Sequence, residues 1–292
     1  MDTTDCDWKR PSFLGLGVAR AGTRWLAQCL TEHPEIIVSA EEASFFVRRR
    51  LLSTWQNGFA WYGSLFHDPS KPNAKVWGEI SPPYLGDAES ADLIRAYVPD
   101  AKLICILRNQ SEALYSAYRL FLHFNPDLSR TTLSYYTYLL YSPKLFDEYF
   151  YLEHIQRFHE LFPKEQLLVL VYDDIKNNPD EVLRRVYRFL GVDETFSAKS
   201  SRTNINPMEL VVKRSELMAR ITRFMSNRRG LSRLSKVMDG FNAIHVKRVD
   251  LPERHRPSEE LNERIRNIYF THNERLGDFL GRDLSHWNLW KE

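Results

Sequence analysis

Residues 13–30, FLGLGVARAGTRWLAQCL, have the order of a short strand, a loop between two glycines and the start of a helix. An apolar run ends at Gly17, and from Trp25 onward the apolar residues recur at helical spacing. Glycines allow a backbone to approach an anion, and the unpaired N–H groups at a helix start carry partial positive charge. Arg20 and Arg24 add full charges. The stretch therefore predicts either a phosphate-binding loop or a plain tight turn.

The phosphate loop of kinases and nucleoside triphosphatases has the same glycine spacing but a different ending. It reads GxxxxGK followed by Ser or Thr, in which the lysine reaches the β- and γ-phosphates and the hydroxyl binds Mg²⁺. Gly17 and Gly22 have the required separation, but Thr23 and Arg24 follow them. The sequence therefore favours a nucleotide that reacts without a metal ion. A metal-dependent kinase and a non-catalytic nucleotide-binding scaffold stay open as alternatives.

The composition is that of a globular α/β protein. Of 292 residues, 43% are hydrophobic, which is enough for a sizeable core. We expect one domain over 1–292, with an N-terminal tail at 1–11 and a less regular, helical and basic stretch at 197–257 that covers the active site. The formal net charge of +2 gives no general affinity for nucleic acid.

The cysteines and the hydropathy pattern favour a cytoplasmic protein. Cys6, Cys29 and Cys105 form no CxxC pair, which is typical of reduced thiols. Cys29 and Cys105 lie within apolar runs, where we expect buried side chains. No segment resembles a signal peptide, and no apolar run is long enough to span a membrane. We therefore expect no membrane partner.

Apolar runs and helical patterns alternate along the chain, which predicts a central parallel sheet flanked by helices on both faces. The predicted strands, besides the one at the start of 13–30, are 36–38, 75–80, 101–107 and 166–172. The predicted helices follow Gly22 and Asn109 and occupy 92–97, 179–190 and 258–280, with helical patterns through 131–162.

Acidic residues stand at the ends of two predicted strands, where open α/β sheets bind their ligands. Glu41 and Glu42 follow the strand at 36–38, and Glu79 precedes the break after the strand at 75–80. The alternative is that the first two only occupy the first turn of a helix that buries the phenylalanines of the AEEASFF segment.

A basic residue ends the central strand in the same way. Arg108 follows 101–107, and Ser116 lies on the next helix, which Asn109 can cap. Because a guanidinium binds phosphate through two hydrogen bonds, Arg108 and Ser116 predict a second phosphate site. The alternative is a surface ion pair at Arg108.

Taken together and in this order, these segments resemble the PAPS-dependent sulfotransferase family, where PAPS is 3′-phosphoadenosine 5′-phosphosulfate. GVARAGTRWL looks like its 5′-phosphosulfate loop and LRNQSEALYSAY like its 3′-phosphate motif. The chain is most similar to the heparan-type glucosaminyl sulfotransferases and their bacterial relatives. The shared features are Glu42 ahead of Phe45 and Phe46, the pair Trp61 and Tyr62, the segment Glu79, Pro82 and Tyr84, and the late Asn273, Gly281 and Arg282.

The resemblance implies a P-loop-like domain that transfers a sulfuryl group from PAPS to a hydroxyl or amine, without a metal. It implies a general base at Glu42, with Glu79 as the substitute, and charge stabilisation by Arg20. The residues implied to hold the 5′-phosphosulfate are Arg20, Ala21, Gly22, Thr23, Arg24 and Trp25, and those implied to hold the 3′-phosphate are Arg108 and Ser116.

The chain departs from the family pattern on the acceptor side. Ile80 stands where a lysine often follows the second glutamate, and Ser44 stands where a histidine often follows the base. The usual loop lysine is Arg20, which keeps the charge but cannot donate a proton. The acceptor is therefore left open between a carbohydrate and a small bacterial secondary metabolite. The late basic loop of the family has only loose counterparts, which are Lys247, Arg248, Arg254 and Arg256.

Because no metal-binding hydroxyl follows the loop glycine, we expect activity without a divalent cation. Sulfuryl transfer measured with excess EDTA should stay within a small factor of its starting rate. Complete loss that Mg²⁺ restores would instead favour the kinase interpretation.

Overall fold

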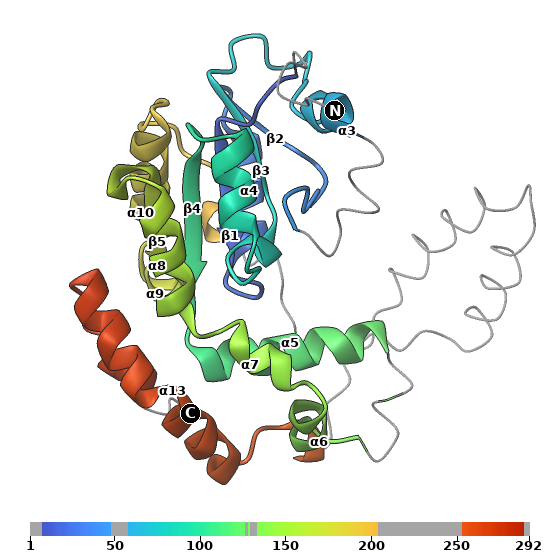
Figure 1. Cartoon of the computed structure of the whole chain (residues 1–292), viewed down its shortest axis with the longest axis vertical. Coiled ribbons are helices and arrows are strands. Elements are labelled where there is room, and N and C mark those ends of the chain that lie inside the picture. Colours follow the sequence, from blue (N-terminus) through green and yellow to red (C-terminus); the bar gives the residue numbers. More distant parts are fainter. Residues whose placement is uncertain (1–7, 48–57, 126–127, 129–132, 204–252, 289–292) are drawn as a thin grey trace, which may run out of the picture. The chain divides into compact units, whose positions relative to one another are not determined.

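The computed structural model describes residues 8–47, 58–125, 128, 133–203 and 253–288 (Figure 1). By compactness the chain divides into two units. The first comprises 1–113, 143–206 and 262–292, and the second comprises 114–142 and 207–261. Most of the stretch at 197–257 that we predicted to be irregular and basic lies outside the described residues. The single-domain organisation stays a prediction.

The first unit is built on one five-stranded sheet with the order β2-β3-β1-β4-β5. All the pairings between neighbouring strands are parallel. The strands are β1 (Phe13–Gly17), β2 (Ile36–Val38), β3 (Val76–Ile80), β4 (Lys102–Leu107) and β5 (Leu167–Val171). The five predicted strands and the parallel α/β class are thereby confirmed.

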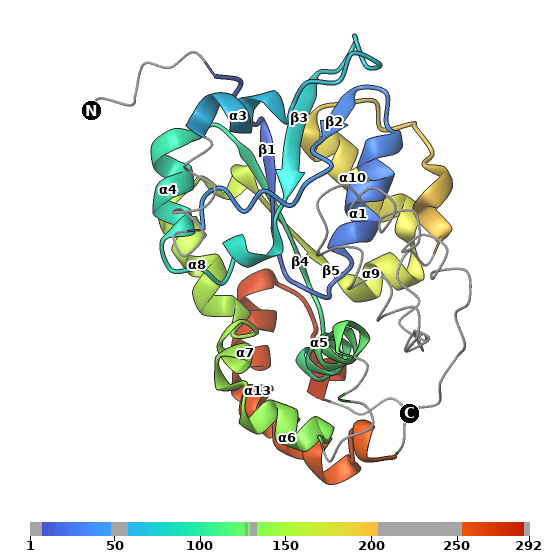
Figure 2. The ribbon, with the colours of Figure 1, turned by 90° about the vertical axis from the view of Figure 1, so that its right-hand side faces the viewer.

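The central strands are apolar because both faces of the sheet are covered. Every residue of β1 is buried, as is β4 after its first residue. The helices α1 (Thr23–Glu32), α9 (Tyr172–Asn177) and α10 (Pro179–Leu190) lie on one side of the sheet, with the 3₁₀ turn η6 (Lys199–Arg202) beside α1 and α10 (Figure 2). The helices α4 (Ser90–Tyr97) and α8 (Tyr151–Leu161) pack together on the other side.

Shorter elements complete the first unit. They are α3 (Gly58–Ser64), α7 (Pro143–Asp147) and the 3₁₀ turns η3 (Pro82–Tyr84), η5 (Lys164–Gln166) and η8 (Ser285–Asn288). The helices α5 (Gln110–Phe124) and α13 (Glu259–Leu280) each cross from one unit to the other along the chain. Trp8 is only 8% exposed, so the predicted tail at 1–11 ends in packed residues.

The helical patterns of 131–162 correspond to α6 (Tyr135–Leu140), α7 and α8. One other helical expectation needs correction. The segment 41–46 contains no helix, so the first-turn alternative for its two glutamates is wrong. Phe45 and Phe46 are nevertheless fully buried, as that alternative also supposed.

The second unit contains most of α5, the helix α6 and the 3₁₀ turn η7 (Glu253–His255). Tyr118 of α5 packs against Tyr135 and Tyr138 around α6. Its hydroxyl group also forms a hydrogen bond with Nδ1 of the fully buried His255. Aromatic rings therefore join the three described elements of this unit.

The buried cysteines agree with the sequence. Cys29 and Cys105 are both 0% exposed and form no disulfide bond with each other. Burial raises the pKa of each thiol to about 12, so both stay protonated and unreactive at neutral pH. Among the described residues, no helix is both long enough and apolar enough to cross a bilayer.

Candidate functional site

The loop after β1 turns sharply at two glycines. Gly17 has a φ of 127°, and a β-carbon there would meet the carbonyl oxygen of Pro82. Gly22 has a φ of 95°, and its β-carbon would lie 3.2 Å from the ring of Tyr172. Side chains rarely adopt these φ values, and a β-carbon would clash at Gly17 and be tightly packed at Gly22. Glycine therefore allows the loop to lie close to both η3 and Tyr172.

The helix that follows the loop begins without an anionic partner of its own. Gly22 is the N-cap of α1 and offers no side chain to the first N–H groups, and the first turn contains no acidic residue. Arg24 is exposed on this turn, whereas Ala21 and Thr23 are buried. A helix start of this kind suits a bound phosphate or sulfate because its dipole and N–H groups favour negative charge.

Trp25 anchors the first turn of α1. Its side chain is 7% exposed, and its indole nitrogen donates a hydrogen bond of 2.8 Å to the carbonyl oxygen of Ser201 in η6. This bond links α1 to a segment far along the chain. A direct contact between Trp25 and a ligand stays a prediction.

Arg108 extends from the end of β4 to the loop after β1. One of its terminal nitrogens donates a hydrogen bond of 2.8 Å to the carbonyl oxygen of Arg20. Its Nε donates at 3.0 Å to Glu112, and its guanidinium carbon lies 4.4 Å from the centre of the Tyr172 ring. The side chain of Arg108 and the backbone of Arg20, which follow different strands, are therefore neighbours. The ion pair that the sequence offered as an alternative is also present.

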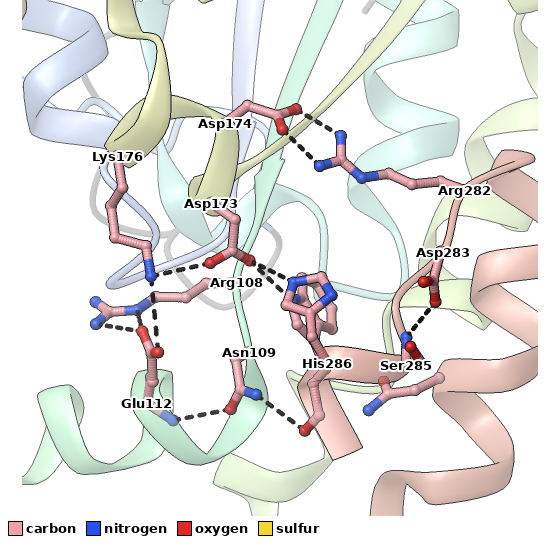
Figure 3. Close-up of polar contacts among 12 residues, drawn as sticks. Arg108, Asn109, Glu112, Asp173, Asp174, Lys176, Arg282, Asp283, Ser285 and His286 are labelled. Carbon is pink, nitrogen blue, oxygen red and sulfur yellow. Dashed lines mark hydrogen bonds and ion pairs between the residues drawn. The ribbon is translucent and has the colours of Figure 1, made fainter. Parts of the chain in front are cut away.

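A second cation lies beside the same carboxylate. Lys176 of α9 is 3.8 Å from Glu112 and 2.9 Å from Asp173 (Figure 3). Its ammonium group also lies over the Tyr172 ring. Two cations and two carboxylates thus alternate at the ends of β4 and β5. The sequence analysis did not predict this cluster. Glu112, four residues after Arg108, could have indicated the ion pair, because residues at this spacing are neighbours on a helix.

The C-terminal segment fixes the turn that carries Arg108. Asn109 donates through its side-chain amide to the carbonyl oxygen of Trp287, and its oxygen caps α5 by accepting from Glu112 N–H (Figure 3). The indole of Trp287 donates to Asp173 at 2.8 Å. The predicted capping by Asn109 is confirmed, and Trp287 anchors the C-terminal segment to the ends of β4 and β5.

Two residues of the late Asn273, Gly281 and Arg282 motif also hold the C-terminal segment in place. Gln110 donates to Asn273 of α13 at 2.6 Å, within the buried region next to Asn109. Arg282 forms two hydrogen bonds with the carboxylate of Asp174, directly after Asp173. Asn273 and Arg282 therefore hold the C-terminal segment against the ends of β4 and β5.

The acidic candidates differ sharply in exposure. Glu41 and Glu42 are exposed in the irregular segment after β2, whereas Glu79 of β3 is 0% exposed. The carboxylate of Glu79 accepts hydrogen bonds from the hydroxyl of Tyr62 at 2.7 Å and from the backbone N–H of Ala43 at 3.1 Å. The hydroxyls of two other residues, Ser81 and Tyr84, also donate to it.

Burial raises the pKa of Glu79, while the hydrogen bonds that it accepts oppose this effect. Among the described residues Glu79 does not contact solvent, so exchange of a proton with an acceptor would require this network to open. A catalytic role for Glu42 or for Glu79 stays a prediction.

Ser116 belongs to the part of α5 in the second unit. It is 8% exposed, and it lies between Tyr115 and Tyr118 on a helix that also carries Arg119. The pKa of Tyr118 is raised by burial and lowered in part by the charge of Arg254, while Arg256 acts on Tyr115 in the same way. Arg254 and Arg256 therefore lie near α5 within this unit. Lys247 and Arg248 lie outside the described residues.

Comparison with known proteins identifies the class to which this site belongs. Residues 10–235, more than half of the chain, match the model of the sulfotransferase domain family. The chain belongs to this family, as the resemblance in its sequence implied.

The curated relatives act in heparan sulfate sulfation according to their names. The chain is 29% identical over 204 residues to human bifunctional heparan sulfate N-deacetylase/N-sulfotransferase 3, covering 64% of this chain and 23% of that protein. It is 28% identical over 196 residues to mouse heparan sulfate glucosamine 3-O-sulfotransferase 3B1, covering 65% and 48%. The chain thus spans between about a quarter and a half of the length of these relatives.

A solved structure has the same fold. The sulfotransferase from Alicyclobacillus acidocaldarius superimposes with a TM-score of 0.69 over 96% of this chain and 99% of the other. The two sequences are 22% identical. The P-loop-like sulfotransferase fold is therefore confirmed for this chain.

Asp173 provides a test of the C-terminal support. Burial alone would raise its pKa, but hydrogen bonds from Trp287, Lys176 and His286 and the charge of Lys176 lower it to about 2. A carboxylate whose pKa is lowered by folding stabilises the fold above its unfolded pKa near 4, and this contribution disappears as the pH falls toward 2. We expect Asp173→Asn to lower the free energy of unfolding by about 2 kcal/mol at pH 7.

Urea unfolding of both proteins between pH 7 and pH 3 measures this effect, and the difference should shrink as the pH falls. The exposed Asp278→Asn is the control and should change stability little at either pH. A difference for Asp173→Asn that is constant with pH would contradict the assignment.

Proposed function

We propose that this protein transfers the sulfuryl group of PAPS to a hydroxyl or amine. The observation that carries the proposal is the hydrogen bond from the guanidinium of Arg108 to the carbonyl oxygen of Arg20. It joins the two phosphate-binding segments inferred from the sequence, which leave different strands of the sheet. Both segments then face the carboxyl edge of the sheet, where α/β proteins bind nucleotides.

The residues present fit the donor nucleotide. The uncapped start of α1, with Arg20 and Arg24 beside it, suits the 5′-phosphosulfate group, and Arg108 suits a phosphate through two parallel hydrogen bonds. Ser116 is the proposed partner of the 3′-phosphate in the second unit. The donor supplies the sulfuryl group, and a divalent ion is not part of the proposal.

Two residues would act on the reacting atoms. Arg20 would stabilise negative charge that develops on the transferred group, because a guanidinium stays charged throughout. Glu42, exposed after β2, would accept the proton that the acceptor hydroxyl or amine loses. Sulfuryl transfer resembles phosphoryl transfer in depending on in-line positioning and charge stabilisation more than on covalent chemistry from the protein.

The proposed acceptor is a carbohydrate or another small molecule. Glucosamine sulfation by the relatives named above supports a sugar, whereas Ser44 and Ile80 depart from that branch of the family. A cytoplasmic location and a small bacterial metabolite as acceptor are parts of the same proposal that the cysteine pattern and the bacterial fold neighbour favour.

The 3′-phosphate assignment predicts a selective loss of affinity in Arg108→Ala. Removing a charged hydrogen-bond donor should weaken binding of adenosine 3′,5′-bisphosphate (PAP) by about 1.5–3 kcal/mol. Binding of adenosine 5′-phosphosulfate, which has no 3′-phosphate, should change much less. Calorimetry with both ligands measures the difference.

The matched control is Arg188→Ala, which removes an arginine of α10 from an exposed ion pair with Glu194. It should leave both affinities unchanged. Equal losses for the two ligands in Arg108→Ala would show that Arg108 does not recognise the 3′-phosphate.

The assignment of the base predicts that Glu42→Gln slows transfer strongly, to a residual rate that can still be measured, without affecting nucleotide binding. Glutamine keeps the size of the side chain but cannot take up the proton, and a general base typically contributes ~10²–10⁴-fold to the rate. The measurements are the rate of sulfate transfer from PAPS to N-desulfated heparin and to 2-naphthol, and the dissociation constant of PAP.

Glu41→Gln is the matched control, because Glu41 is the adjacent exposed acid. It should retain the rate of the wild-type protein. Normal turnover in Glu42→Gln would refute the role of Glu42 as the base but would leave the nucleotide assignment intact.

A further inference from the structure

Three of the shared sequence features meet at one buried carboxylate. Tyr62 of the Trp-Tyr pair and Tyr84 of the E-x-x-P-x-Y segment both donate their hydroxyl hydrogens to Oε1 of Glu79. The paired Phe45 and Phe46 pack on the same tyrosines. Residues from β3, η3, α3 and the segment after β2 thus surround a single acidic group.

The backbone that follows Glu42 is held by this group. The N–H of Ala43 donates to Oε2 of Glu79 at 3.1 Å, and the N–H of Ser44 donates at 2.8 Å to the hydroxyl of Ser81, which in turn donates to Glu79. The N–H of Phe46 donates to the hydroxyl of Tyr84 at 3.4 Å. Side chains therefore satisfy N–H groups that a helix or sheet would otherwise satisfy.

The conformation of this segment depends on such a restraint. Ser44 has a φ of 48°, a left-handed value that is uncommon for residues other than glycine. Such a conformation persists only where the surroundings enforce it. Ala43 and Ser44 are buried, whereas Glu42 immediately before them is exposed. The direction in which the Glu42 side chain leaves the backbone is therefore set by its buried neighbours.

Aromatic packing fixes the hydroxyl groups themselves. The rings of Phe45 and Tyr62 are stacked, with centres 4.2 Å apart and planes at 5°. Phe46 contacts the edge of Tyr62 at 5.5 Å and lies 6.0 Å from the ring of Tyr84. Both tyrosines are 0% exposed, so water cannot replace their hydroxyls as donors to Glu79.

We propose that Glu79 is a positioning residue, which acts with the hydroxyls of Tyr62 and Tyr84 to hold the 43–46 backbone and thereby orient Glu42 for proton removal. This inference rests on the proposed function through the role of Glu42. Glu79 itself does not touch the acceptor, because it is buried and already accepts hydrogen bonds on both carboxylate oxygens.

The test is a double-mutant cycle between the tyrosine hydroxyls and Glu42. Tyr84→Phe and Tyr62→Phe each remove one hydroxyl but keep the ring, in the wild-type background and in Glu42→Gln. In the wild-type background we expect the kcat for sulfate transfer from PAPS to N-desulfated heparin or 2-naphthol to fall about 10- to 100-fold. The KM for PAPS and the dissociation constant of PAP should not change.

In the Glu42→Gln background the same tyrosine changes should have no further effect, because the group that they orient is absent. The matched control is Tyr187→Phe, which removes a hydroxyl that is buried without a hydrogen-bond partner. It should leave kcat unchanged in both backgrounds. Equal losses in the two backgrounds, or full activity in both tyrosine variants, would overturn the proposal.

Amide hydrogen exchange provides a readout that does not need turnover. The N–H groups of Ala43 and Ser44 should exchange at least about tenfold faster in Tyr84→Phe than in the wild-type protein, because opening of this segment becomes easier. Unchanged exchange would overturn the proposal even if activity fell. Glu79→Gln would perturb the network more than either tyrosine variant. If the Glu79→Gln protein does not fold, the tyrosine variants alone still test the proposal.

Failure of the proposed function has a different signature. A wild-type protein that neither binds PAP nor transfers sulfate would refute the proposed function, whatever the exchange rates at 43 and 44. Loss of transfer in Glu42→Gln together with normal transfer in both tyrosine variants would refute only the role of Glu79.

Discussion

The candidate site depends on one constraint, which is that the five strands of the sheet are all parallel. Parallel strands end at one common edge, so the segments that follow them meet although they lie far apart in sequence. The loop at 17–22, the segment at 39–47 and the turn at Arg108 all leave this edge. The covered faces of the sheet supply the apolar core that holds the strands in register. The candidate site residues therefore lie mostly in the connections, which the strands hold in position.

Two carboxylates hold those connections in place through hydrogen bonds and ion pairs. Glu79 organises the segment after β2, and Glu112 lies between Arg108 and Lys176 at the ends of β4 and β5. The two carboxylates differ in environment, because Glu79 is 0% exposed and Glu112 is 39% exposed. The Arg108–Glu112 pair is only partly exposed, with the arginine side chain at 19%. The buried network around Glu79 is suited to a permanent restraint.

Local patterns in the sequence predicted the strands, because a buried parallel strand is a continuous apolar run whose ends are marked by glycine, proline or charge. They also predicted the loop at 17–22 and the cap at Asn109, whose chemistry lies within a few residues. They could not predict that Tyr62 donates to Glu79 or that Trp287 donates to Asp173, because these partners are 17 and 114 residues apart. The segment at 41–46 was ambiguous for the same reason, since side chains distant in sequence replace the helical hydrogen bonds there.

The most direct test of the central claim is calorimetric titration of the wild-type protein with PAP and, separately, with ATP and Mg²⁺. A carboxyl edge built for PAPS should bind PAP without any divalent ion, and ATP with Mg²⁺ should fail to displace it. Tight binding of ATP that requires Mg²⁺, with no binding of PAP, would contradict the account.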